Sequence, residues 1–107
     1  MVAPENLEVR SQSLGSTEVL SVTGEVGSAT VDALAGAIRD GLAAEPETMV
    51  VDLSEVAAFG ARGLGVLLAA DDRARRLDCR LVVVPGTGPV RRLLDMPGAD
   101  QRLTVAS

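Results

Sequence analysis

The 107-residue sequence contains no histidine, tryptophan, tyrosine or lysine, and it has one phenylalanine and one cysteine. Without histidine the chain lacks the commonest general base and the commonest transition-metal ligand. The single cysteine, Cys79, excludes an internal disulfide, and its apolar surroundings favour a small buried side chain over a reactive thiol. One thiol with carboxylates makes a poor zinc site. We therefore expect no catalytic residue, no metal and no cofactor.

Aromatic side chains and net positive charge are also lacking. With one aromatic residue and a net charge of −5, the chain offers neither base-stacking platforms nor a basic footprint for nucleic acid. Its arginines between 73 and 80 are interleaved with aspartates. The spacings Asp71–Arg75 and Asp72–Arg76 predict a solvated helix face stabilised by local ion pairs. We expect no nucleic-acid partner.

Long apolar runs are missing as well. No run approaches the about 20 residues that a membrane-spanning helix needs. The first residues, M-V-A-P-E-N, lack the basic-then-apolar layout of a signal peptide. We expect a cytoplasmic protein without stable membrane insertion. Because domains commonly have about 100–150 residues, we expect residues 1–107 to form a single domain.

What the chain does contain is an alternation of strand and helix patterns. The expected elements are, in order, strands at 7–11 and 18–24, a helix at 28–44, a strand at 49–56, a helix beginning near residue 60, a strand at 79–85, a short helix at 88–97 and a strand at 103–107. The short turn at Gly15 and Ser16 predicts a hairpin. The nearly continuous apolar run at 49–56 predicts a strand covered on both faces. Alternation after a hairpin predicts an α/β fold with a mostly parallel mixed sheet.

Further sequence features predict the ends of one helix and the buried face of another. The helix at 28–44 is expected to be capped by Ser28 or Thr30 and to end at Pro46. The helix after residue 60 is expected to bury an apolar stripe. That stripe is Val66, Leu67, Ala70, Ala74 and Leu77.

The turn before that helix contains three glycines but no reactive group. Gly60, Gly63 and Gly65 give G-x-x-G-x-G, the reverse of the dinucleotide fingerprint, and no G-K-[ST] is present. This spacing favours a tight turn with close helix–sheet packing over a nucleotide site. Ser54 lacks the G-x-S-x-G elbow and is expected to bond its own turn backbone. Asp52 is expected to hydrogen-bond a neighbouring loop, and an enzyme is not expected.

Three segments carry a resemblance to a known family. V-V-D-L-S-E-V followed by a turn and G-L-G-V-L-L resembles the signature of STAS-domain proteins, especially bacterial anti-sigma factor antagonists. V-T-G-E-V with Thr30 and Leu34 resembles the G-E-[LI]-D-x-x-T-x-x-x-L segment of that family. L-V-V-V-P-G and V-R-R-L-L-D resemble its closing strand and helix. The resemblance covers essentially the whole chain and implies a small sheet with helices packed on one side.

The family pattern departs from this chain at its phosphorylation site. The family motif D-L-S-x-V-x-x-[MI]-D-S-S-G-L, laid on the sequence from Leu53, places its Asp-Ser-Ser on Gly60, Ala61 and Arg62. A further family aspartate falls on Gly27. In the antagonists the first of these serines is phosphorylated by the anti-sigma factor, itself a serine kinase, and phosphorylation prevents binding. The resemblance implies that Ala61 leaves this chain without that switch.

The resemblance implies a protein-interaction regulator that binds an anti-sigma factor of kinase-like ATPase fold and thereby releases a sigma factor. The expected partner-binding residues are Gly27, Ser28, Thr30, Ser54, Gly60, Ala61, Arg62 and Gly63. Arg62 either contacts an acidic partner surface or is solvated. Two alternatives stay open: a STAS subunit of a stressosome scaffold or lipid-transport complex, and a sensor of a nucleotide or lipid. The sequence is also compatible with a homo-oligomer and does not determine the oligomeric state.

Overall fold

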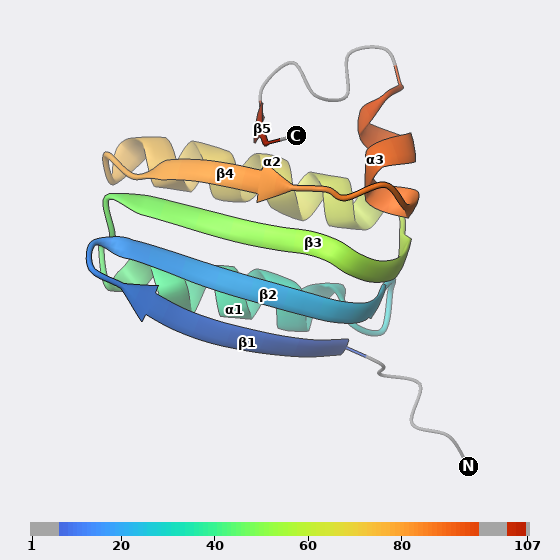
Figure 1. Cartoon of the computed structure of the whole chain (residues 1–107), viewed down its shortest axis with the longest axis horizontal. Coiled ribbons are helices and arrows are strands. Elements are labelled where there is room, and N and C mark those ends of the chain that lie inside the picture. The colour runs from blue at the N-terminus through green and yellow to red at the C-terminus, as the bar shows by residue number, and fades with distance from the viewer. Residues whose placement is uncertain (1–6, 97–102, 107) are drawn as a thin grey trace.

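The computed structural model describes residues 7–96 and 103–106 (Figure 1). Its elements are β1 (Leu7–Leu14), β2 (Thr17–Val26), α1 (Val31–Ala43), β3 (Thr48–Phe59), α2 (Ala61–Arg76), β4 (Arg80–Val84), α3 (Pro89–Leu94) and β5 (Thr104–Val105). One expectation, the absence of a signal peptide at residues 1–6, lies outside the described residues. The prediction that the last helix continues to Pro97 was wrong, because α3 ends at Leu94 with Asp95 as its C-cap residue.

The strands form one five-stranded sheet in the order β1-β2-β3-β4-β5. β1 and β2 are antiparallel and the other neighbours are parallel. α1 and α2 lie side by side on one face of the sheet, and α3 packs against β3 near the end where α2 begins (Figure 1). The predicted α/β fold, with an N-terminal hairpin and helices on one side, is confirmed.

One face of the sheet is left without helices. In β3, Met49, Val51 and Leu53 are buried beneath the helices, whereas Val50 and Asp52 on the opposite face are only half-buried. The prediction that this strand is covered on both faces was therefore wrong. Parallel crossovers are right-handed, and here each steps in the same direction along the sheet, so α1 and α2 fall on the same face.

The buried face of α2 differs from the predicted stripe. Its buried residues are Gly63, Leu67, Ala70, Asp71 and Ala74. Val66 is only half-buried and Leu77 is exposed, so the stripe is rotated toward the glycine and the aspartate. The predicted Asp71–Arg75 ion pair forms, with Arg75 Nε donating to Asp71 Oδ2 over 2.7 Å. The Asp71 carboxylate is nevertheless buried, whereas the Arg75 side chain is exposed. The prediction of a solvated helix face is therefore wrong for Asp71.

Cys79 is buried, as predicted, between α2 and β4 in the chain. Burial raises the pKa of its thiol, which favours the protonated form. Among the residues placed by the structure, no three histidine, cysteine, aspartate or glutamate side chains gather to hold a metal ion. Within the same ranges no helix is both long enough and apolar enough to cross a membrane.

A buried carboxylate links the two strands of the β1–β2 hairpin through hydrogen bonds. Glu18 on β2 accepts hydrogen bonds from the hydroxyl of Ser11 and, over 2.6 Å, from that of Ser13, both on β1. The Ser11 bond first, and the Ser13 bond second, lower the pKa of Glu18, and burial opposes them. Because the folded protein holds this carboxylate ionised more strongly than the unfolded chain does, the resulting stability is present above about pH 4.5 and is lost as the pH falls through the lowered pKa.

A Glu18→Gln substitution should remove this part of the acid sensitivity. The neutral amide forms weaker bonds to the two hydroxyls than a carboxylate does, so we expect a loss of about 1 kcal/mol at pH 7. Urea unfolding at pH 7 and at pH 3.5 measures both effects, and the difference between variant and parent should shrink at the lower pH. Glu55→Gln, at an exposed position, is the matched control. An equal loss at both pH values would contradict the assigned role of the Glu18 charge.

Candidate partner-binding edge

The strand register brings two separate segments of the chain together. Val26, the last residue of β2, pairs with Phe59, the last residue of β3. Gly27 and Gly60 follow these paired residues directly, so the β2–α1 loop and the start of α2 meet at the carboxyl edge of the parallel strands. Both helices begin at this end, on the right in Figure 1. We call the exposed residues Gly27, Ser28, Gly60, Ala61 and Arg62 the docking edge.

The β2–α1 loop is fixed from beneath by Thr30. Its hydroxyl donates to the carbonyl of Glu25 over 2.6 Å and accepts from the amide of Gly27 over 3.0 Å. Thr30 is 3% exposed. Thr30 is the N-cap residue of α1, but its side chain makes no capping hydrogen bond. The expectation that Ser28 or Thr30 caps the helix through its side chain was therefore wrong, because this hydroxyl closes the preceding loop instead.

The glycine-containing turn is shorter than the sequence suggested. β3 continues to Phe59 and α2 begins at Ala61, so the turn is the single residue Gly60, and Gly63 and Gly65 are helical. A Cβ on Gly63 would lie 2.6 Å from Cε1 of Phe59. The close helix–sheet packing predicted for this segment is present at Gly63. That residue is buried and offers no exposed contact surface.

The exposed start of α2 is chemically inert apart from one cation. The carbonyl of Gly60 accepts the amides of Gly63 and Leu64 over 3.0 and 3.2 Å, which closes the first helical turn. Ala61 and Arg62 project outside this turn and are both exposed. A guanidinium at a helix N-terminus gains nothing from the helix dipole. The edge is thus a surface of small side chains with one arginine.

A shallow depression adjoins the loop. It has a volume of about 240 Å³ and is lined by residues 25–30 and Ala58. This is smaller than the about 300–1,000 Å³ of ordinary ligand pockets. Its lining is backbone and short side chains, which suits contact with a partner's surface better than enclosure of a ligand.

Ser54 lies apart from the docking edge. It lies within β3. Four residues of the strand separate it from Phe59, and each residue of a strand advances the chain by about 3.3 Å. Its hydroxyl and its amide both donate to Asp52 Oδ1, over 2.6 and 3.0 Å. The expectation that Ser54 bonds the backbone of a turn was wrong, because it bonds a carboxylate within a strand. The expectation that Asp52 hydrogen-bonds a neighbouring loop was also wrong, because its carboxylate accepts both bonds from Ser54 in the same strand.

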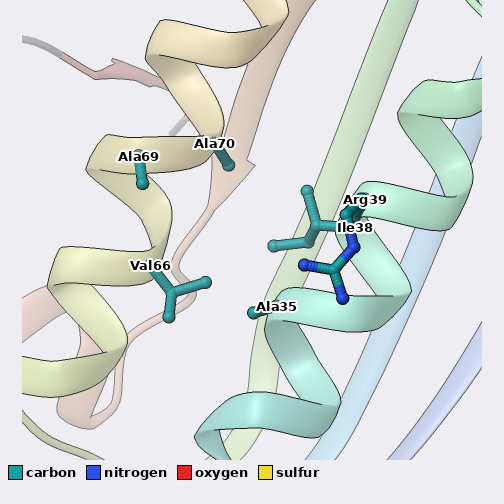
Figure 2. Close-up of a pocket in the computed structure, with 6 residues that line it drawn as sticks. All are labelled: Ala35, Ile38, Arg39, Val66, Ala69 and Ala70. Atoms are coloured by element: carbon teal, nitrogen blue, oxygen red, sulfur yellow. The ribbon is translucent and has the colours of Figure 1, made fainter.

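The structure shows a groove that the sequence did not predict. It lies between α1 and α2, where Ala35, Ile38 and Arg39 face Val66, Ala69 and Ala70 (Figure 2). Its volume is about 140 Å³, room for roughly five water molecules. Val66, which the sequence placed in the buried stripe of its helix, lines this groove and is only half-buried. The groove is too small to enclose a nucleotide or a lipid chain.

The architecture of the chain can be compared with known protein families. A family model described as "Mlab, STAS domain" matches residues 9–105. The chain therefore belongs to the STAS domain family.

Proteins similar to this chain include anti-sigma factor antagonists. The anti-sigma-F factor antagonist RsfB of Mycobacterium tuberculosis is 31% identical over 107 residues, which cover all of this chain and 87% of the relative. A crystal structure of an anti-sigma factor antagonist from Mycobacterium paratuberculosis superposes with a TM-score of 0.83 at 30% identity, covering 98% and 89% of the two chains. Unphosphorylated SpoIIAA shares the fold, with a TM-score of 0.75 at 15% identity over 94% and 89% of the chains.

Proposed function

We propose that this STAS protein is a cytoplasmic anti-sigma factor antagonist that binds an anti-sigma factor through the docking edge and so releases a sigma factor. Its homology to antagonists supports the role. The proposed partner has the kinase-like ATPase fold. The role requires no catalysis by this chain.

The geometry of the edge supports a docking role. Gly27, Ser28, Gly60 and Ala61 present short side chains or none, so a partner's surface can approach the backbone closely. Thr30 fixes the loop from below through two hydrogen bonds. A pre-formed surface loses little conformational entropy on binding. Arg62 adds one exposed cation, which suits an acidic patch on the partner.

The observation that carries the proposal is the exposed Ala61 in the first turn of α2. At this position the family resemblance places the phosphorylated serine. A phosphate would add about −1.5 to −2 charge, which disrupts a docked surface by repulsion and desolvation. Ala61 has no hydroxyl to accept it. We propose that the edge stays in the state that corresponds to an unphosphorylated antagonist.

Incubation with the anti-sigma factor and ATP should leave the mass of this protein unchanged. The only hydroxyls in the β2–α1 loop are those of Ser28 and Thr30, and Thr30 is buried and engaged on both sides. An Ala61→Ser variant, treated in parallel, should gain one phosphate. Intact-mass spectrometry with peptide mapping measures both. Phosphate on Ser28 or Ser54 of the parent, with loss of binding, would show that a different switch operates.

A direct binding assay against anti-sigma factors, with and without ATP, tests the function itself. We expect binding to the parent protein to survive ATP, because no phosphate can accumulate at Ala61. If no anti-sigma factor binds, the proposed function fails. Two alternatives remain predictions. Pull-down with identification of the bound proteins tests whether the chain is a subunit of a scaffold or transport complex. Thermal-shift measurements with nucleotides and lipids test whether it is a sensor, since a bound ligand raises the melting temperature.

A further inference from the structure

The strand β1 forms an edge of the sheet that is unusually open. It is eight residues long and pairs with β2 along its whole length without a register shift. Among the described strands it has no neighbour on its other side. Its sequence, L-E-V-R-S-Q-S-L, contains no proline, glycine or lysine. Natural edge strands are usually protected from pairing with another chain by charged residues, proline or a bulge. Of these features β1 has only the two charges of Glu8 and Arg10, which have opposite signs.

The hairpin turn determines which backbone groups of β1 point outward. Gly15 has φ 63° and, with Ser16, forms a two-residue turn between the paired Leu14 and Thr17. Such a turn hydrogen-bonds its two flanking residues, and along an antiparallel pair these bonded residues recur at every second position. The even-numbered residues of β1 therefore bond β2. The amides and carbonyls of Leu7, Val9 and Ser11 point toward the open edge.

The charges on β1 are arranged symmetrically about Val9. Glu8 and Arg10 project from the helix-free face of the sheet, with their side chains 66% and 80% exposed, and Arg10 Nε lies 3.6 Å from Glu8 Oε2. Suppose that a second β1 pairs antiparallel with the first so that the two Val9 residues are opposite. Each Glu8 then lies opposite Arg10 of the partner subunit. These are non-hydrogen-bonded positions, at which facing Cα atoms are only about 4.5 Å apart.

We propose that β1 is a self-association surface, on which a second copy of this chain adds its own β1 in antiparallel register centred on Val9. The partner is a second copy because the charge pattern is complementary to itself, giving two reciprocal Glu8–Arg10 pairs. A register centred on Ser11 would place Arg10 opposite Gln12 and lose both pairs. The outward backbone groups of Leu7, Val9 and Ser11 are bonded in the same arrangement.

This surface is separate from the docking edge. β1 runs along one side of the sheet, whereas the docking edge lies at the carboxyl ends of β2 and β3 (Figure 1). The proposed β1 pairing therefore uses none of the residues of the docking edge. A single pair of strands buries less surface than a standard interface, so the dimer should be weak and concentration-dependent.

Charge reversal with restoration tests the proposal. Sedimentation velocity at low salt, up to millimolar concentration, should show dimers of the parent protein. Glu8→Arg and Arg10→Glu alone each place like charges opposite one another, so each should raise the dimer dissociation constant at least about tenfold. The combined Glu8→Arg/Arg10→Glu variant should regain the parent's constant. A mixture of the two single variants should form a heterodimer. Circular dichroism checks the fold of each variant.

Amide hydrogen exchange gives an independent measurement of register. As concentration rises, exchange should slow at the amides of Leu7, Val9 and Ser11 and stay unchanged at Glu8, Arg10 and Gln12, which already face β2. A monomeric parent at millimolar concentration would overturn the proposal. Dimerisation of the single variants with the parent's constant would overturn it as well, since it would place the interface elsewhere, for example at the exposed Leu14. Failure of the combined variant to recover would overturn the proposed register.

Discussion

An Ala61→Glu variant should bind the anti-sigma factor at least about tenfold more weakly than the parent protein, and up to about a hundredfold if the new carboxylate is fully buried at the interface. An unpaired polar or charged group buried on docking costs about 1–3 kcal/mol or more, and each 1.4 kcal/mol is about a factor of ten in affinity. Ala61 is exposed in the free protein. The charge therefore becomes costly only when a partner covers the edge.

The folding of this variant should be unimpaired. An acidic side chain in the first turn of a helix interacts favourably with the helix dipole, so the melting temperature should stay level or rise. Ala69→Glu is the matched control, because Ala69 is an exposed alanine on the same helix, about two turns further along. Isothermal titration calorimetry of both variants separates the two positions. If both lose affinity alike, or if neither does, Ala61 is not part of the interface.

A Gly86→Ala variant should lose about 2–4 kcal/mol of stability. Gly86 has φ 72°, a conformation that an L-residue adopts only with strain. An added Cβ would also lie 2.7 Å from Cα and 2.8 Å from Cβ of Ser54. The obstacle is strand backbone, which cannot move aside as a flexible side chain could. The loop after β4 therefore packs against β3 only if residue 86 has no side chain.

Gly15→Ala separates the two causes of that loss. Gly15 also has a positive φ, 63°, but an added Cβ would meet no atom within 4 Å. It should therefore lose only the backbone term, about 1–2 kcal/mol. Thermal unfolding of both variants measures the difference, at about 4–8 °C for each kcal/mol in a domain of this size. Equal losses for the two variants would show that the contact with Ser54 adds nothing.

The element order was predictable because the signals that encode it are local. Gly15 and Ser16 between two alternating segments predicted the hairpin. β4 ends at Val84, one residue before the predicted end of this strand at Pro85. In α1 the buried residues Val31, Leu34, Ile38 and Leu42 recur at helical spacing, which is a local signal in the sequence. Errors arose where burial depends on distant segments. Val50 has the same apolar character as Val51, but only Val51 lies under the helices.

The candidate site was predictable in composition and less so in arrangement. The sequence specified that no hydroxyl follows Phe59 in the turn, and it placed Gly60, Ala61 and Arg62 at the start of a helix. It grouped Ser54 and Gly63 with them, but Gly63 is buried against Phe59 and Ser54 lies within β3 on Asp52. The spacing along the chain does not reveal that β3 continues to Phe59, because its extension is set by pairing with β2.

By itself the sequence determined which chemical groups this protein carries: it has no histidine, a single thiol, and no hydroxyl at residue 61. Residue identity determines which groups can react, whatever the fold. Only the tertiary structure decided which of these groups are neighbours and which are covered. It pairs Val26 with Phe59 just before the docking edge, buries Asp71, and leaves β1 open along one side. These outcomes depend on strand order and on crossover handedness, which join segments far apart in the chain.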